Sequence, residues 1–142
     1  MEQRDLLKDQ IEQLGKVLAN ILSDLLGLKS KGQTSQGIEA TNQRLQGELD
    51  IDIEKITTLT KKELKDYLKN RHLRAEHLEI LSECLKEIGK GKIEENKKDA
   101  KMKLEKAIEL LDIADEISKT MSFDRINKKK EIENVLQSSS PT

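Results

Sequence analysis

The chain has 142 residues and carries 26 Lys and Arg residues against 27 Asp and Glu residues, which gives a formal net charge of −1. This balance disfavours attraction of the whole surface to nucleic acid or to an anionic membrane. One Tyr and one Phe are too few to line a pocket with stacked rings, and no apolar run approaches the roughly 18 residues that cross a membrane.

Cys84 is the only cysteine, so no disulfide forms within the chain. The first residues lack the basic-then-apolar layout of a signal peptide, and both features favour a cytoplasmic location. A chain of this length buries enough surface for its own core without a metal. We expect one all-helical domain over residues 1–137 and a disordered tail over residues 138–142.

The first thirty residues predict a helix from about Gln3 to Lys31. Large aliphatic residues recur there at spacings of four and three, which places them along one side of a helix. They are Leu7, Ile11, Leu14, Leu18, Ile21, Leu25 and Leu28. Gly15 lies inside this helix, where glycine costs about 1 kcal/mol relative to alanine. We therefore expect a close crossing by a neighbouring helix or, as the alternative, a bend.

A second helix is expected from Thr34 or Ser35, either of which can cap it, to about Gly47. Gly27 and Gly32 weaken and end the first helix before it. The inward face of the second helix is expected to consist of Ile38, Ala40 and Leu45. Because it has few large apolar residues, this helix is predicted to be the least stable element.

Apolar and acidic residues alternate over residues 49–54, which locally resembles a strand. The sequence offers no partner strand, so we expect a short helical turn or an extended connector held by Ile53 and Ile56. Thr60 and Glu63 then have the spacing of a capping box and start another helix. The buried residues expected in that helix are Leu64, Tyr67 and Leu68.

Three further helices are predicted over residues 73–88, 93–119 and 123–137. The first ends at Gly89 and Gly91. The next has a seam of alternating Ala and Leu, which permits close packing, while Asp99 and Lys103 form a supporting ion pair on its outside. The fold class is therefore all-α, with about five to six helices in antiparallel helical hairpins.

Two segments resemble a known family. Ala100, Leu104 and Ala107 match the small, large, small spacing of the second helix of a tetratricopeptide repeat. The run RDLLKDQIEQLGKVL at residues 4–18 and the segment EKAIELL at residues 105–111 resemble a family of short, all-helical, tetratricopeptide-like bacterial proteins of unknown function. The resemblance implies tetratricopeptide-like or helical-bundle packing and a bacterial origin, and it supplies no catalytic residue.

No residues have the spacing of a reactive site. His72 and His77 are five apart, whereas two histidines that bind one zinc from a helix are four apart. Cys84 lies on the apolar side of its helix with His77, and burial there makes a thiol inert. We therefore predict no catalytic residue, no cofactor and no metal site.

One region has a local excess of four positive charges, since only Glu63 and Asp66 oppose its six basic residues. These six residues form a candidate interaction surface: Lys61, Lys62, Lys65, Lys69, Arg71 and Arg74. The surface suits phosphate or an acidic partner. No glycine-rich phosphate loop or stacking aromatic accompanies it, so nucleic acid is disfavoured as the ligand.

Two functions remain open. We expect a non-enzymatic helical protein-interaction module that binds another protein or forms a homo-oligomer. The alternative is a small-ligand-binding protein or an enzyme whose polar site is assembled from distant helices. Apolar surface left over on the first and last helices predicts self-association or a protein partner.

Overall fold

The computed structural model of the chain describes residues 2–139, with side chains from residue 8 to residue 138. This part contains seven helices and no strand, so the predicted all-α class is confirmed with one helix more than expected. The helices are α1 (Glu2–Ser30), α2 (Thr34–Leu49), α3 (Ile53–Thr58), α4 (Lys61–Asn70), α5 (Ala75–Lys92), α6 (Lys97–Ser118) and α7 (Phe123–Ser139). The additional helix is α3, which forms in the segment where a helical turn or a connector was expected.

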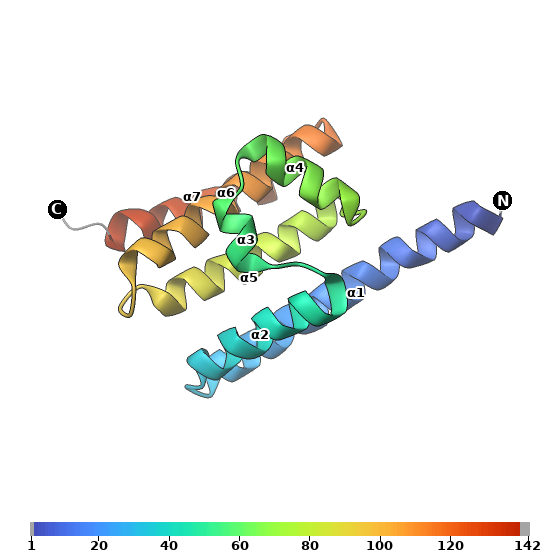
Figure 1. Cartoon of the computed structure of the whole chain (residues 1–142). Coiled ribbons are helices and arrows are strands. Elements are labelled where there is room, and N and C mark those ends of the chain that lie inside the picture. Colours follow the sequence, from blue (N-terminus) through green and yellow to red (C-terminus); the bar gives the residue numbers. More distant parts are fainter. Residues whose placement is uncertain (1, 140–142) are drawn as a thin grey trace.

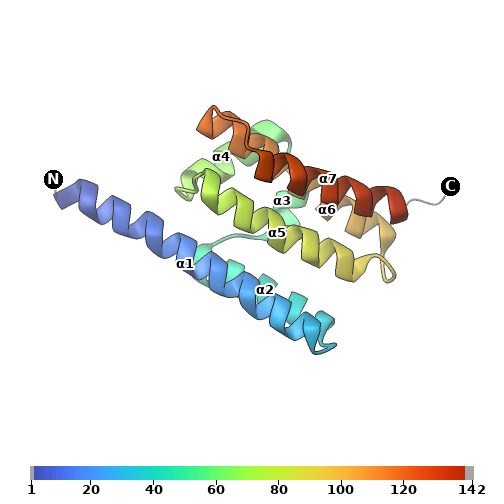
Figure 2. The same ribbon diagram turned by 180° about the vertical axis from the view of Figure 1, so that it is seen from behind.

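Two helical hairpins lie along each other (Figure 1). The α1–α2 hairpin packs through α1 against α5, and α5 makes its largest contact with α6, which in turn contacts α7. The short helices α3 and α4 bridge the two hairpins. The N-terminal half of α1 extends past the ends of its neighbours, as the view from behind also shows (Figure 2).

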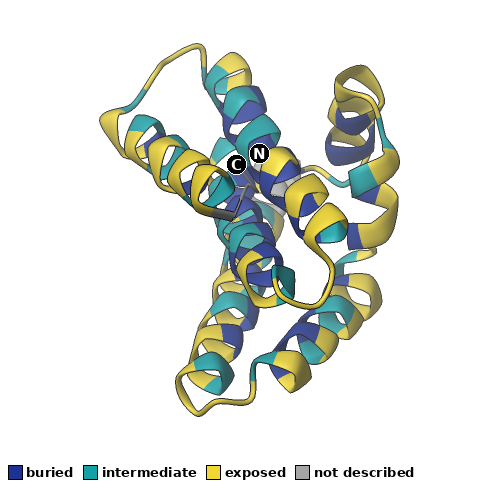
Figure 3. Cartoon of the chain, turned by 90° about the vertical axis from the view of Figure 1, so that its left-hand side faces the viewer, coloured by how far each residue is buried: buried dark blue, intermediate teal, exposed yellow. Residues whose placement is uncertain are grey.

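The core lies mainly between α5 and α6, whose buried residues are spread over most of each helix. In Figure 3 the buried residues lie on the inner sides of the helices, and the exposed residues face outwards. Helix α5 continues through Gly89 and Gly91, so the prediction that these glycines end it is wrong. A Cβ at Gly89 would lie 2.8 Å from Leu104 Cγ, and one at Gly91 would lie 2.8 Å from Ile38 Cδ1. The two glycines are therefore positions of close helix approach.

Helix α1 buries its seam only in its C-terminal half. Leu18, Ile21 and Leu25 are at most 1% exposed, whereas Ile11 and Leu14 are half-buried. The seam residue Leu7 lies outside the described side chains. Helix α1 ends at Ser30, followed by Gly32 with a φ of +77° that favours glycine, as expected.

The segment that connects the two hairpins has the caps and the buried residues that its sequence predicts. Asp52 Oδ1 accepts hydrogen bonds from the backbone N–H groups of Glu54 and Lys55, which caps α3. Ile53 and Ile56 of α3 are buried, as are Leu64, Tyr67 and Leu68 of α4. The predicted capping box is confirmed, with Thr60 N to Glu63 Oε1 at 2.9 Å and Glu63 N to Thr60 Oγ1 at 3.2 Å.

Lys103 corrects the expected orientation of the charged residues on α6. Its ion pair with Asp99 forms, at 2.7 Å, but its side chain is 0% exposed and also pairs with Glu54 at 3.0 Å. Helix α3 covers this side of α6, so Lys103 is inside rather than outside. Two carboxylates compensate the cost of burying its charge.

The C-terminal helix α7 includes Ser138 and Ser139, which the sequence assigned to the tail. The rest of the predicted tail, residues 140–142, lies outside the described residues. Ile132 is the buried apolar residue of α7, and Val135 and Leu136 pack partly against the core.

Candidate functional site

A hollow of about 570 Å³ opens between the projecting half of α1, helix α4 and the C-terminal end of α6. We call it the α1–α4 groove. Its lining residues are Ile11, Lys65, Asp66, Lys69, His72, Leu73, Arg74, Glu116 and Ile117. They come from three segments of the chain that are far apart in sequence, so the groove exists only in the folded protein.

The floor of the groove is apolar and partly open to solvent. Ile11 of α1 is half-buried, Leu73 before α5 is 5% exposed, and Ile117 of α6 is 48% exposed. The chain following Ile117 adds two exposed side chains, Met121 at 72% and Phe123 at 85%. Apolar surface is therefore concentrated at this end of α6.

The rim brings together part of the basic surface predicted from the sequence. Lys65, Lys69 and Arg74 line the groove, whereas Lys61 and Lys62 are exposed on α4 outside the lining. Glu116 of α6 pairs with Lys61 at 3.0 Å and with Lys65 at 2.9 Å. Hydrogen bonds from Lys65 and Lys61 hold the pKa of the Glu116 carboxyl below its ordinary value.

Arg71, the sixth residue of the predicted basic surface, fixes the connection after α2 instead. Its guanidinium stacks over the Tyr67 ring, 3.5 Å from the centroid, and bonds to the carbonyl and the carboxylate of Asp50. The Tyr67 hydroxyl accepts a hydrogen bond from Asp52 N at 2.9 Å. Most of the N–H donors of the Arg71 guanidinium are therefore used within the protein.

His77 anchors the α1 wall of the groove. Its Nδ1 accepts a hydrogen bond from the Arg74 backbone N–H at 2.8 Å, so Nε2 carries the ring proton and donates to the Ile11 carbonyl at 2.8 Å. The ring lies beside Gly15, where a Cβ would be 3.7 Å from His77 Cδ2. Helix α5 therefore meets α1 at Gly15 through this buried histidine, but the contact is an ordinary one and leaves room for a Cβ, so it is not the close crossing that was expected.

A second hollow, of about 450 Å³, lies on the other side of α1 and shares Ile11 and His72 with the α1–α4 groove. Gln10 and Gln13 also line it, together with Leu14. The projecting half of α1 therefore stands as a wall between two hollows.

Cys84 does not take part in the groove. It is buried in α5, and burial, with smaller contributions from Glu83 and Glu87, raises the pKa of its thiol to about 12. Its position on the apolar side with His77 agrees with the prediction. Within the described part of the chain, no group of three or more His, Cys, Asp or Glu residues is placed to hold a metal ion.

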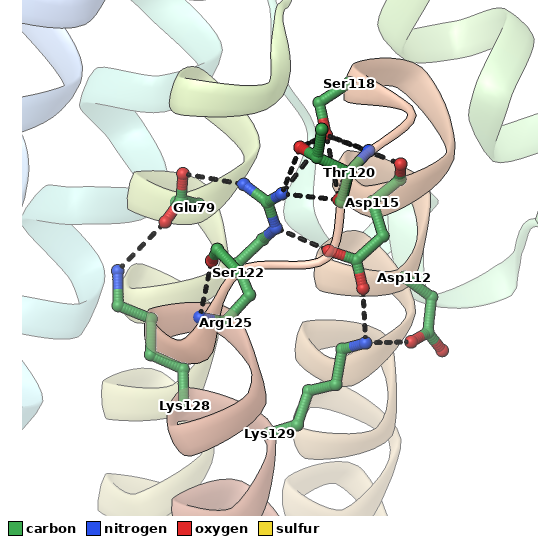
Figure 4. A network of polar contacts seen from close by, with 9 residues as sticks. All are labelled: Glu79, Asp112, Asp115, Ser118, Thr120, Ser122, Arg125, Lys128 and Lys129. Carbon is green, nitrogen blue, oxygen red and sulfur yellow. Dashed lines mark hydrogen bonds and ion pairs between the residues drawn. The ribbon is translucent and has the colours of Figure 1, made fainter.

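A second polar cluster joins α7 to α5 and α6 (Figure 4). Arg125 Nε donates to Asp115 Oδ1 at 2.5 Å, and its Nη2 donates to the Thr120 carbonyl at 2.8 Å. Lys129 bridges Asp112 and Asp115, and Glu79 contacts both Arg125 and Lys128. The charged groups satisfy one another, so this cluster is a structural clamp.

Partial burial works to raise the pKa of Asp115. Hydrogen bonds from Lys129 and Arg125 outweigh this effect and leave the pKa below the ordinary aspartate value. The clamp is therefore most stable with Asp115 ionised.

Sequence reasoning did not assign Ile117 of α6 to a site. It named neither Arg125 nor Glu116. The sequence does contain a signal for Ile117, because this residue lies just outside the Ala and Leu seam of α6 and near the end of the helix. An apolar residue in such a position stays exposed when no other helix packs over it. The positions of Arg125 and Glu116 depend on helix packing.

The fold is that of an all-α protein built from helical hairpins, and its open site is a groove between helices. Comparisons of the chain with family models, curated proteins and solved structures give no match. In the described residues, no helix combines the length and the apolar character that crossing a membrane requires.

Proposed function

We propose that the protein is a non-enzymatic helical module that binds an amphipathic helix of another protein in the α1–α4 groove. The observation that carries this proposal is the distribution of uncovered apolar surface. Five large hydrophobic side chains are exposed in the described part of the chain, and three of them are Ile117, Met121 and Phe123. Apolar surface gathered in one place on a folded chain usually marks an interaction site.

The walls of the groove support a helical ligand. Amphipathic helices bind by laying an apolar face into a groove lined by other helices, with contacts at positions i, i+3 or i+4, and i+7. Ile11, Leu73 and Ile117 supply the apolar floor for such a face. An incoming helix would pack beside both α1 and α4 and would bury more surface than it could against one neighbour.

Other features support the same proposal. The resemblance to tetratricopeptide-like bacterial proteins favours a binding module, because stacked helical hairpins bind partners through grooves. This support is an analogy between folds. The single cysteine, a buried free thiol, favours the reducing cytoplasm. We therefore include a bacterial, cytoplasmic setting in the proposal.

Site-specific photocrosslinking tests the proposal. A photoreactive phenylalanine analogue replaces Ile117 in the groove, or Met102 as the matched control. Both residues are exposed on α6, but they lie about 22 Å apart along the helix axis. We expect the analogue at position 117, in cells producing the protein at its natural level, to give a discrete protein adduct.

Mass spectrometry then identifies the crosslinked segment. A segment with an apolar stripe of helical period supports the proposal. Adducts of equal yield from position 102, adducts only to small molecules, or no adduct from position 117 would each contradict it.

A further inference from the structure

The charges that line the α1–α4 groove are not balanced. Among the residues whose side chains the structure describes, the ionisable groups of the lining come from α4, the turn between α4 and α5, and the end of α6. Three lining residues are cationic, Lys65, Lys69 and Arg74, against the carboxylates of Asp66 and Glu116. The described lining therefore has a positive excess, and it lies on the side formed by α4 and the turn that follows it.

These charged residues differ in whether they form ion pairs within the protein. Glu116 is shared by Lys61 and Lys65, so two ammonium groups face one carboxylate. Lys69 and Arg74 are exposed and form no ion pair with any described residue. Their charges are available to a ligand at the corner between α4 and α5.

Asp66 is the opposing charge at this corner. It lines the groove, is exposed, and has no ion-pair partner in the described part of the chain. One carboxylate beside Lys69 and Arg74 still leaves a positive excess there. The balance favours an anionic flank on whatever helix occupies the groove.

We propose that the partner of the α1–α4 groove is an amphipathic helix with acidic residues on the one flank that faces α4 and α5. This inference rests on the proposed helix-binding function and adds the chemistry of the partner. The apolar stripe of the helix covers Ile11, Leu73 and Ile117, while its acidic flank pairs with Lys69 and Arg74.

Synthetic peptides test the inference by fluorescence anisotropy with the full chain. Three labelled 18-residue helical peptides share one leucine stripe and carry Glu, Gln or Lys along one flank. We expect the Glu peptide to bind about tenfold more tightly than the Lys peptide, because exchanging attraction for repulsion at two exposed pairs has about this effect. The preference should weaken as salt is added.

Charge reversal in the protein provides the matched comparison. The double variant Lys69→Glu/Arg74→Glu should reverse the preference, so that the Lys peptide binds more tightly than the Glu peptide. Lys62→Glu makes the same kind of change on α4 outside the groove and should leave the preference within about twofold. Circular dichroism checks that each variant retains its helical content.

The outcomes separate this inference from the proposed function. If all three peptides bind equally and Ile117→Asp abolishes binding, the groove binds helices but the acidic partner is wrong. If Lys62→Glu alters the preference as much as the double variant, general surface charge explains it and the inference falls. If light scattering shows a dimer that Ile117→Asp dissociates, the occupant is a second copy, which also overturns the inference.

Discussion

The α5–α6 and α1–α2 hairpins are built on similar apolar patterns but bury them to different extents. In α5 and α6 the facing residues are buried over most of both helices. Helix α1 has 29 residues, whereas its neighbours α2 and α5 have 16 and 18, so its first turns extend past both. An apolar seam determines which face of a helix packs, and the lengths of the neighbours determine how much of that face is covered.

The uncovered part of α1 is also the wall of the α1–α4 groove. Ile11 is half-buried because only one side of it meets the core, near His77. The same residue lines hollows on both sides of the helix. The incomplete packing of the first hairpin thus leaves open the space between α1 and the end of α6, which is the candidate site.

The largest expected effect tests where the core lies. Leu111→Ala in α6 and Leu18→Ala in α1 should each lower the free energy of unfolding by about 2–5 kcal/mol, since both side chains are 0% exposed. Ile11→Ala should cost less than half as much, because Ile11 is only half-buried. Urea denaturation measures all three values. Equal costs at Ile11 and Leu18 would show that the projecting half of α1 is packed as fully as the rest.

Two arginines test the difference between a buried clamp and a surface ion pair. Arg125→Met should cost about 3 kcal/mol, because it leaves the nearly buried carboxylate of Asp115 with fewer partners. Arg44 bridges Asp24 and Glu48 on the exposed face of the first hairpin, so Arg44→Met should cost about 0.5 kcal/mol. Hydrogen exchange should rise first in α7 of the Arg125 variant. Similar costs for the two variants would contradict the structural role assigned to Arg125.

Acid should weaken the clamp before it affects the apolar core. The pKa of Asp115 is lower in the folded chain than in the unfolded chain, so its contribution to stability is present above the ordinary aspartate pKa of about 3.9. The contribution is lost as the pH falls through the lower, folded-state pKa. Asp115→Asn should therefore reduce the dependence of stability on pH below about 4. Urea denaturation at a series of pH values measures this dependence. If the loss of stability below about pH 4 is the same in this variant as in the original protein, Asp115 does not contribute to it.

Local sequence signals predicted much of the fold. The capping box at Thr60 and Glu63 and the buried side of α4 depend on neighbours within a few residues, and both were identified correctly. The seam of α1 was also recognised, although its pattern gave no measure of how much of it is covered. Such features are set by helix period and capping chemistry, which are visible in one sequence.

Other features depend on which helices meet. Lys103 looks like a solvent-facing residue until α3 covers it and supplies Glu54. The glycines of α5 resemble a helix end, because the sequence does not show that Leu104 packs where a side chain would be. The groove requires Ile11, Leu73 and Ile117 to come together from three separate parts of the chain, and no local sequence pattern predicts this.

Two glycines that differ in what surrounds them should respond to alanine with opposite signs. At Gly89 in the tight hairpin, an added Cβ would lie 2.8 Å from Leu104 Cγ and 3.2 Å from the Ala100 carbonyl oxygen. The backbone oxygen cannot move away easily, so Gly89→Ala should cost about 1–3 kcal/mol despite the better helix propensity of alanine. Thermal unfolding gives the comparison with Gly15→Ala.

At Gly15 the nearest atom to an added Cβ, His77 Cδ2, is 3.7 Å away, which is ordinary contact. Gly15→Ala should therefore raise the free energy of unfolding by up to about 1 kcal/mol through helix propensity. Gly27→Ala is the matched control, because Gly27 lies in the same helix with no atom within 4 Å of the new Cβ. A gain at Gly27 with a loss at Gly15 would mean that His77 holds α1 more tightly than ordinary contact allows. The loosely packed hairpin would then be rigid at this contact with α5.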